Sequence, residues 1–420
     1  KVFLMRELII DGGKKLSGEV KISRAKNSVL ALMAASLMIR GEVFINDCPA
    51  IGDVFVMGDI LRSLGAKVVF KQDGAYIDST DVFSTRLSKT LTQKIRASFF
   101  TVGALVSRFK VACVPRPGGC KIGARPVDIH IEALKKIGVN AFETEEALNF
   151  FAPSLTGGNV TLRYPSVGAT ENLMMAATLA DGVTLIRNAA KEPEIVDLQS
   201  FLRRAGANIS GAGTDVIRVD GVKKLSGGFS FTPIEDRIET GTYLLAVLSA
   251  GGEALLKGAN LGNILPLVEK IRYNTCQITQ KDDNIYIQTF STRAGYGKIV
   301  TAPYPGFPTD LHPQLVAAAI SAQGKTVLTE AVFDSRFGYV KELLKTGADI
   351  KADGRVVTVN GKNIFGAEMQ AEDLRGGAAL IIAALAAEGR STITGMNHVE
   401  RGYLEIDKKL ASLGARVKEK

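Results

Sequence analysis

Cysteine and histidine are scarce in this sequence of 420 residues, which excludes two common ways of stabilising a fold. The four cysteines are Cys48, Cys113, Cys120 and Cys276. They form no CxxC pair and are too few for a disulfide framework. The three histidines, His130, His312 and His398, lie too far apart for a local zinc motif. We therefore expect neither a structural metal nor a disulfide-stapled domain.

Long apolar runs are also absent. The longest, Ser28 to Ile39 and Gly377 to Ala387, fall far short of the ~20 residues that span a bilayer. Lys1 to Ile10 contains no basic stretch followed by an apolar segment and a cleavage site. We expect a cytoplasmic protein that has no membrane partner.

Basic residues exceed acidic ones by 52 to 43, a net charge of +9, but they do not cluster. No basic block is longer than two residues, and no aromatic-interleaved basic stretch accompanies the pairs. This distribution argues against nucleic acid and favours small anionic ligands. At ~150 residues per domain, the length suggests two or three domains.

What the sequence does contain is a repeat. A helical phrase that ends in glycine and leads into a strand recurs in six units of about seventy residues, and the fourth copy has lost the glycine. The copies begin at Leu61, Leu134, Leu202, Ile271, Leu344 and Leu410. The glycine is typical of the left-handed residue that ends a helix.

Each unit also contains a second helix that is apolar nearly all round and is therefore predicted to be buried. These segments are Val29–Ile39, Ala97–Val106, Leu173–Ala180, Tyr243–Ala250, Leu315–Ala322 and Ala378–Ala387. The unit reads strand, buried helix, strand, amphipathic helix, strands, which predicts an α/β fold.

Three such units make a reasonable globule, so we predict two pseudo-threefold domains, 23–234 and 1–22 plus 235–420. The chain crosses between them near 225–235, and Arg6–Ile22 is expected to complete the last unit. The alternative is a solenoid of six repeats, but no terminal unit resembles a polar cap.

The starts of the buried helices carry both capping residues and charge. Ser, Thr, Asn and Asp at these positions are most often helix caps. The charged residues beside them are Lys26, Arg96, Glu239, Asp310 and Arg375. Helix N-termini attract anions, and added cations favour phosphate or carboxylate binding.

The segment Arg116 to His130 is the most distinctive. It places Cys120 among three glycines and two prolines, which predicts an exposed loop. Lys121 and Arg125 nearby favour the reactive thiolate. The other three cysteines are interpreted as buried apolar residues.

Four motifs carry a family resemblance: Pro117-Gly-Gly-Cys-Lys-Ile-Gly-Ala-Arg-Pro-Val-Asp128, Ser23-Arg-Ala-Lys-Asn27, Phe307-Pro-Thr-Asp310 and Glu400-Arg-Gly-Tyr403. Together they resemble the UDP-N-acetylglucosamine 1-carboxyvinyltransferases, the enolpyruvyl transferases of peptidoglycan synthesis. The resemblance implies a two-domain inside-out α/β barrel of six βαβαββ units. It also implies transfer of the enolpyruvyl group of phosphoenolpyruvate to the 3′-hydroxyl of UDP-N-acetylglucosamine, with release of phosphate and no cofactor. We expect a monomer.

The resemblance also assigns roles to residues. Asp310 matches a candidate general base and Cys120 the proton donor, while Lys26 and Arg401 complete the catalytic set. Lys26 and Asn27 match the pair that binds phosphoenolpyruvate. The arginines around the reacting phosphate and carboxylate are matched by Arg125, Arg336, Arg375 and Arg401. Further substrate contacts are Arg96, Arg125, Pro126, Val127, Asp128, Ile129, Ser166, Val167, Gly168, Val332, Arg336 and Arg375. With cysteine at position 120, the resemblance implies inactivation by fosfomycin.

Two positions depart from the family pattern. Arg24 stands where glycine is common, and Tyr164 where some relatives carry a lysine that Arg163 could replace. Two alternatives remain: a shikimate-pathway enolpyruvyl transferase, and a non-catalytic paralogue that binds the nucleotide sugar. Intact Lys26, Cys120, Asp310 and Arg401 argue against the second, since a binding module needs neither proton donor nor base.

Overall fold

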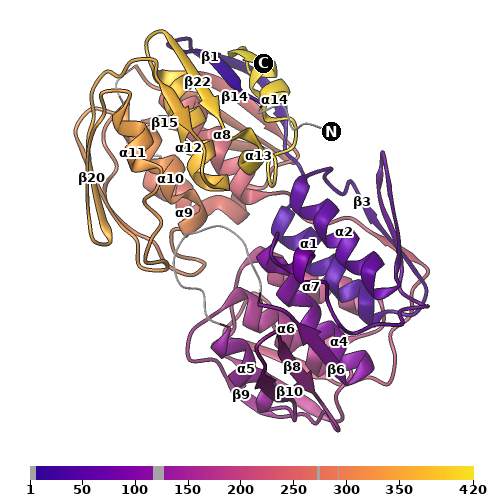
Figure 1. Ribbon diagram of the computed structural model, residues 1–420. Coiled ribbons are helices and arrows are strands. Elements are labelled where there is room, and N and C mark those ends of the chain that lie inside the picture. Colours follow the sequence, from indigo (N-terminus) through magenta and orange to yellow (C-terminus); the bar gives the residue numbers. More distant parts are fainter. Residues whose placement is uncertain (1–5, 117–126, 272–274, 292) are drawn as a thin grey trace. The chain divides into compact units, whose positions relative to one another are not determined.

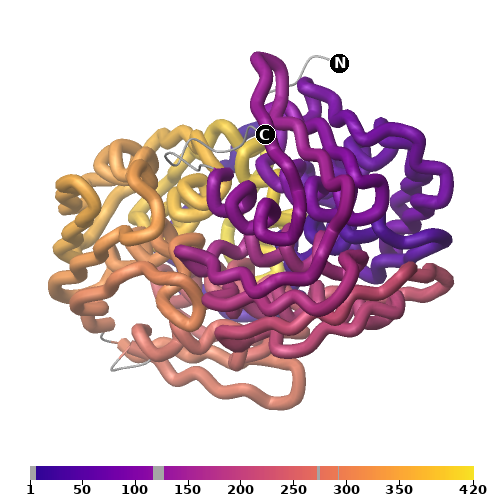
Figure 2. The backbone as a smooth tube through the Cα atoms, turned by 90° about the horizontal axis from the view of Figure 1, so that it is seen from below, coloured from indigo at the N-terminus to yellow at the C-terminus, as the bar shows by residue number. Residues whose placement is uncertain are grey.

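The computed structural model describes residues 6–116, 127–271, 275–291 and 293–420 (Figure 1). Their contacts divide into two compact units. Unit 1 comprises the described residues of 6–23 and 235–420, and unit 2 those of 24–116 and 127–234. In Figure 2 the orange and yellow segments gather in unit 1, and the purple ones in unit 2. None of the helices in these described ranges combines the length and apolarity that a bilayer crossing requires.

Unit 2 is built around three helices, α1 (Lys26–Ala35), α4 (Thr101–Phe109) and α6 (Val167–Thr178), and α4 packs against both others. Outside them lie α2 (Gly52–Leu64), α3 (Lys89–Thr92), α5 (Asp128–Lys135) and α7 (Pro193–Arg204). One sheet has the order β13 (Phe229–Phe231), β3 (Glu42–Asn46), β5 (Gly74–Asp78), β4 (Lys67–Lys71). The second is β6 (Val111–Val114), β8 (Leu148–Phe151), β7 (Asn140–Glu143), and the third β11 (Asn208–Ser210), β12 (Val216–Asp220), β10 (Val183–Arg187), β9 (Asn159–Thr161).

Unit 1 repeats this plan around α8 (Arg237–Ala250), α10 (His312–Ile320) and α12 (Leu374–Ala386), which pack pairwise. The outer helices are α9 (Leu261–Ile271), α11 (Val340–Leu344), α13 (Met396–Val399) and α14 (Ile406–Ser412). Two sheets are β15 (Cys276–Lys281), β16 (Asn284–Thr289), β14 (Gly252–Lys257), β2 (Leu16–Lys21), and β17 (Gly297–Val300), β18 (Lys325–Thr329), β20 (Val356–Asn360), β19 (Asp349–Asp353). The third is β21 (Glu368–Gln370), β22 (Arg390–Thr394), β1 (Leu8–Asp11), β23 (Arg416–Glu419).

The sheet pairing confirms the predicted repeat and fold class. Each four-stranded sheet has one parallel edge pair, and its remaining strands are antiparallel. In three of them the parallel pair flanks a central helix in sequence: β9 and β10 around α6, β17 and β18 around α10, and β21 and β22 around α12. The remaining three-stranded sheet adds a parallel bridge between Arg86 and Cys113. These are the βαβαββ units of an inside-out α/β barrel.

One expectation about the N-terminal strands was wrong. β1 completes the sheet of the last unit, between β22 and β23, as expected. β2 instead pairs in parallel with β14, in the sheet that follows α8, while β13 pairs with β3, which follows α1. β2 precedes α1 in sequence but pairs with the strand that follows α8. Conversely, β13 precedes α8 but pairs with the strand that follows α1. A phrase that repeats equally well in both halves cannot specify this exchange.

The central helices are buried on nearly every side, as their apolar composition predicts. Several of these helices begin earlier than predicted. Their first turns contain polar residues, which are also buried but which an apolar pattern does not mark as helical. In α8, Arg237, Glu239 and Thr240 precede the apolar stretch, and Asp236 caps the helix by accepting from the backbone N–H of Ile238 and Glu239. The apolar pattern locates the middle of such a helix better than its start.

Glycines end the amphipathic helices as predicted. Across the repeats these glycines have positive φ, from 79° at Gly414 to 107° at Gly65. An L-residue with a side chain is strained in this left-handed region, so glycine is the residue that stops the helix and turns the chain into the next strand.

Candidate active site

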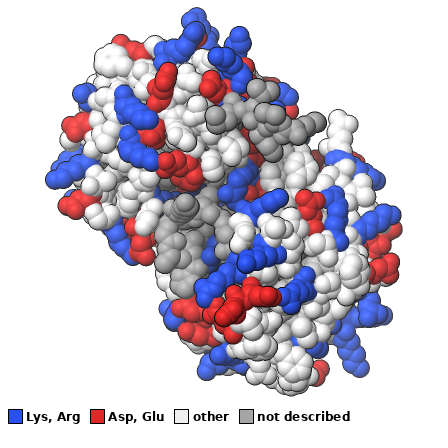
Figure 3. All heavy atoms as spheres, in the orientation of Figure 1, with Lys and Arg blue, Asp and Glu red and all other residues white. Residues whose placement is uncertain are grey.

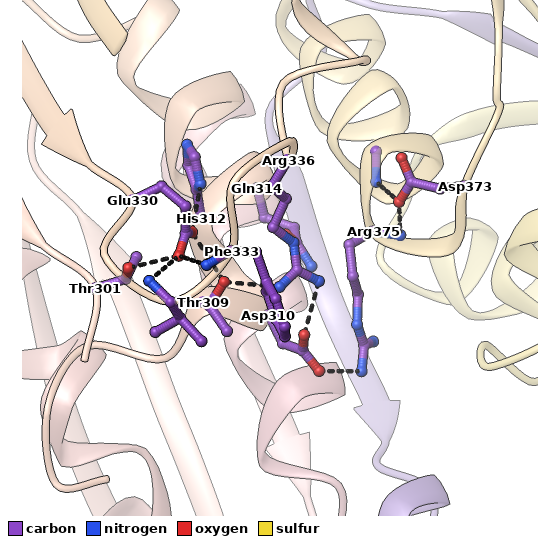
Figure 4. A network of polar contacts seen from close by, with 12 residues as sticks. Thr301, Thr309, Asp310, His312, Gln314, Glu330, Phe333, Arg336, Asp373 and Arg375 are labelled. Atoms are coloured by element: carbon purple, nitrogen blue, oxygen red, sulfur yellow. Dashed lines mark hydrogen bonds and ion pairs between the residues drawn. The ribbon is translucent and has the colours of Figure 1, made fainter. Parts of the chain in front are cut away.

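A carboxylate in front of α10 lies between two buried arginines (Figure 4). Asp310 belongs to the 3-10 turn Thr309–Leu311. Its Oδ1 accepts from Nη2 of Arg336 at 2.7 Å, and its Oδ2 accepts from Nη2 of Arg375 at 3.2 Å. The arginine side chains are 4% and 5% exposed, against 28% for Asp310. The structure therefore brings together three of the residues that the sequence singled out.

The start of α12 delivers Arg375. Asp373 caps this helix by accepting from the backbone N–H of Arg375 and Gly376, both at 2.9 Å, which confirms a capping role at this position. Nη1 of Arg375 donates to the Tyr403 hydroxyl at 3.2 Å. Burial by itself would lower the pKa of the Arg375 guanidinium, but Tyr403 and Asp310 outweigh it and raise that pKa. Arg375 is therefore a permanent cation.

Glu330, directly after β18, is a buried residue that the sequence reasoning missed. Its carboxylate accepts from the hydroxyls of Thr301 and Thr309, from Nδ1 of His312 and from the backbone N–H of Val332 and Phe333. Burial alone would raise its pKa, but His312, Thr301 and Thr309 lower the pKa to about 2. A lone carboxylate after the apolar segment 327–328 was the available signal.

His312 completes this network from the first turn of α10. Its Nε2 lies 3.1 Å from the Tyr339 hydroxyl, and its Nδ1 lies 2.9 Å from Glu330. Burial lowers the pKa of His312 against the opposing pull of Glu330. A neutral imidazole that donates from Nδ1 and accepts at Nε2 satisfies both contacts.

In unit 2, the predicted pair Lys26 and Asn27 begins α1. Nζ of Lys26 donates to Oδ2 of Asp53 at 3.0 Å, and their side chains are 12% and 6% exposed. Arg24, the departure from the family pattern, pairs with Asp47 at 3.1 Å. The lysine predicted to bind substrate is thus held by a carboxylate, and the added arginine has an acidic partner of its own.

The starts of α5 and α6 hold further residues predicted in this unit. Val127 precedes α5, whose first residue, Asp128, pairs with Arg163. Arg163 also bonds Glu132 at 3.0 Å and lowers the pKa of Asp128. Arg163, the residue before Tyr164, therefore forms ion pairs with two acidic residues of α5.

The start of α6 has a helix cap. The Ser166 hydroxyl accepts from the backbone N–H of Ala169 at 3.3 Å. Val167 and Gly168 form the first turn. A Cβ on Gly168 would lie 2.9 Å from the His130 ring, so glycine allows α6 to pack closely against α5.

The remaining predicted residues occupy separate places. Arg96 begins the 3-10 turn Arg96–Phe100, and Ile129 lies in the first turn of α5. Val332 follows β18, and Arg401 lies in the turn after α13. Cys120, Arg125 and Pro126 lie outside the described residues.

Of the three cysteines predicted to be buried, two are buried, whereas Cys48 is only partly buried. Cys113 and Cys276 are buried, and burial raises the pKa of the partly buried Cys48 thiol to about 12. Within the described ranges, no group of three or more His, Cys, Asp or Glu could hold a metal ion. On the surface that Figure 3 shows, acidic and basic side chains are interspersed over much of each unit.

Comparison with known proteins identifies the family to which the chain belongs. The family model described as EPSP synthase (3-phosphoshikimate 1-carboxyvinyltransferase) matches residues 10–410. The UDP-N-acetylglucosamine 1-carboxyvinyltransferase 2 of Caldanaerobacter subterraneus subsp. tengcongensis is 45% identical over 414 residues, 98% of this chain and 99% of that protein. The protein of the same name from Bacillus subtilis is 40% identical, over 98% of this chain and 96% of the relative.

Solved structures agree on the fold. The enolpyruvyl transferase NikO from Streptomyces tendae has a TM-score of 0.89 at 26% identity and covers 99% of both chains. EPSP synthase from Acinetobacter baumannii has a TM-score of 0.77 at 18% identity over 99% of this chain and 100% of the other, a likeness of fold alone. The chain therefore belongs to the enolpyruvyl transferase family, among the UDP-N-acetylglucosamine 1-carboxyvinyltransferases.

Proposed function

We propose that the protein transfers the enolpyruvyl group of phosphoenolpyruvate to the 3′-hydroxyl of UDP-N-acetylglucosamine and releases phosphate. The observation that carries this proposal is the Asp310 carboxylate held between the buried Arg336 and Arg375. A base beside two permanent cations suits an alcohol that must lose a proton next to a phosphate and a carboxylate. The names of the 40–45% identical relatives support the choice of acceptor.

In the proposed reaction, C3 of phosphoenolpyruvate gains a proton while the sugar oxygen bonds to C2. Phosphate then leaves C2, and C3 loses a proton to restore the double bond. Asp310 accepts the hydroxyl proton, and Cys120 donates to C3. Lys26, Asn27, Arg336, Arg375 and Arg401 bind the phosphate and carboxylate.

Arg336 is well suited to an anion. Among the described residues its Nε–H has no hydrogen-bond acceptor, although the side chain is almost fully buried. A buried N–H without an acceptor costs free energy that a substrate oxygen would recover. We assign the nucleotide sugar to Arg96, Arg125–Ile129, Ser166–Gly168 and Val332, and we place the reaction in cytoplasmic peptidoglycan synthesis.

A phosphate-release assay tests the proposal. Phosphoenolpyruvate with UDP-N-acetylglucosamine should give phosphate and an enolpyruvyl nucleotide sugar, identified by mass, whereas shikimate 3-phosphate should give neither. Phosphate released only with shikimate 3-phosphate would reverse the assignment, and release with neither acceptor would favour a binding protein.

Asp310→Asn tests the base. It should lower kcat by about 100-fold or more, because the amide cannot accept the hydroxyl proton. Asp349→Asn makes the same charge change at an exposed position on β19 and should leave kcat within about twofold. Equal activity of the two variants would remove Asp310 from the proposed mechanism.

A further inference from the structure

The Glu330 carboxylate divides its hydrogen bonds between two sides (Figure 4). Oε1 accepts from the Thr301 hydroxyl at 2.8 Å and from the backbone N–H of Val332 and Phe333 at 2.8 and 3.1 Å. Oε2 accepts from the Thr309 hydroxyl at 2.8 Å and from Nδ1 of His312 at 2.9 Å. One oxygen therefore holds backbone, while the other faces the turn that carries Asp310.

The Oε2 side dictates how Thr309 contacts Arg336. A threonine hydroxyl has one proton, and Thr309 donates it to Glu330. Its oxygen is then left as an acceptor, and Nη1 of Arg336 donates to it at 2.7 Å. A group that donated from the Glu330 position would instead compete with Arg336 for this oxygen.

Oε1 of Glu330 also acts on Arg336 indirectly, through the backbone of Phe333. The Arg336 guanidinium lies over the Phe333 ring, 5.3 Å from its centroid, and Glu330 holds the Phe333 backbone. Thr309 bonds Nη1, which leaves Nη2 directed at Asp310. Thus Glu330, which bonds neither Arg336 nor Asp310 in the structure, constrains two neighbours of the arginine.

We propose that Glu330 is a positioning residue that holds Arg336 for phosphoenolpyruvate by directing the Thr309 hydroxyl. The inference rests on the proposed function and adds to it the residue that orients the anion-binding arginine. When the Thr309 hydroxyl is lost, the misplaced Arg336 guanidinium loses affinity for phosphoenolpyruvate, whereas Val332, which the other Glu330 oxygen holds, keeps its place for the nucleotide sugar. The effect is therefore expected in one KM and not in the other.

Two threonines provide a matched test, which is needed because Glu330→Gln can simply fail to fold. The hydroxyls of Thr301 and Thr309 both donate to Glu330 at 2.8 Å, but only Thr309 contacts Arg336. Thr301 also accepts from the backbone N–H of Ala331 at 2.8 Å, so its loss removes two bonds of the network as well.

Thr309→Val should raise KM for phosphoenolpyruvate about tenfold or more and leave KM for UDP-N-acetylglucosamine within about threefold. Thr301→Val should leave both within about threefold. Thr309→Ser keeps the hydroxyl and should restore KM for phosphoenolpyruvate. Thermal unfolding of each variant shows the general structural cost.

Two results would overturn the inference: an equal rise in the phosphoenolpyruvate KM of both valine variants, or a Thr309→Val variant that loses stability while that KM is unchanged. Wild-type turnover is measured first, and its absence contradicts the proposed function alone. In that case the same comparison is made on the Kd of phosphoenolpyruvate by calorimetry, with the same two overturning results.

Discussion

Two carboxyl groups, one in each unit, are both almost fully inaccessible to solvent, but their pKa values are shifted in opposite directions. Glu330 in unit 1 is 0% exposed and Glu171 in α6 of unit 2 is 1% exposed. Burial raises the pKa of Glu330, but His312, Thr301 and Thr309, which donate to its carboxylate, lower the pKa to about 2. Burial, with Glu194 and Glu192 nearby, raises the pKa of Glu171 well above its ordinary value, and its Oε2 has no hydrogen-bond partner among the residues that the structure describes. Burial raises the pKa of both groups, and the donors around Glu330 reverse the direction of its shift.

Two buried tyrosines of unit 1 differ in the same way, in whether the polar group of the side chain has hydrogen-bond partners. Tyr243 and Tyr403 are each 1% exposed. The Tyr403 hydroxyl contacts Thr242, Gln314 and Arg375, whereas the Tyr243 hydroxyl has no hydrogen-bond partner in the described part of the chain. The Tyr403 hydroxyl is thus satisfied beside Arg375, but within the described residues Oε1 of Gln314 and Nε of Arg336 have no hydrogen-bond partner, so unpaired polar atoms occur near the proposed substrate arginines as well as elsewhere in the core.

The largest effect is expected from Glu330→Ala, which leaves its donors unpaired in a buried site. We expect a loss of about 3–5 kcal/mol in the free energy of unfolding at pH 7, measured with urea. Because the folded pKa lies below the ordinary 4.5, the wild-type contribution is complete above pH 4.5 and disappears as the pH falls towards about 2.

The difference between wild type and Glu330→Ala should therefore shrink below pH 4.5. Urea unfolding at several acidic pH values checks this. A difference that stays constant would show that the carboxylate charge is not what the donors stabilise, and the contrast with Glu171 would then fail.

Glu171→Gln should change the free energy of unfolding in the opposite direction and stabilise the protein at high pH. Since the folded pKa of Glu171 is raised, the wild type is most stable below pH 4.5 and loses stability as the pH rises towards the folded pKa. The neutral amide avoids this loss, so the variant should be about 1–2 kcal/mol more stable at pH 8, with a smaller gain at pH 5.

Glu388→Gln is the control, because this glutamate is exposed after α12. Its effect on the free energy of unfolding should be the same at both pH values. A Glu171→Gln variant that behaves like this control would mean that Glu171 is charged in the folded protein.

The smallest expected effect is the difference in stability between the two tyrosine variants. Tyr403→Phe should cost about 1–2 kcal/mol, because Thr242, Gln314 and Arg375 lose a shared partner, whereas Tyr243→Phe should change stability by less than about 0.5 kcal/mol. Thermal unfolding of the two variants side by side measures the difference. Equal losses would indicate that packing around the rings outweighs the hydroxyl contacts.

Much of the fold could be predicted because its signals are local. The apolar helices and the glycines after the amphipathic helices depend on neighbouring residues, and their recurrence indicates the repeat. The exchange of β2 and β13 could not be predicted, because strand partners far apart in sequence leave no periodic signal. Of the site, Asp310 was singled out by its motif, Arg375 by its place at a helix start and Arg336 by the family resemblance, but no motif contains Glu330 together with Thr301 and Thr309.

By itself, the sequence determined the unit, its number of copies and the residue types at each helix start, because helix burial and helix ends follow from short-range patterns. The tertiary structure alone decided which strands pair and which buried polar groups find donors. Hydrogen bonds require distances near 3 Å between side chains that lie tens of residues apart, and only the packed core sets those distances.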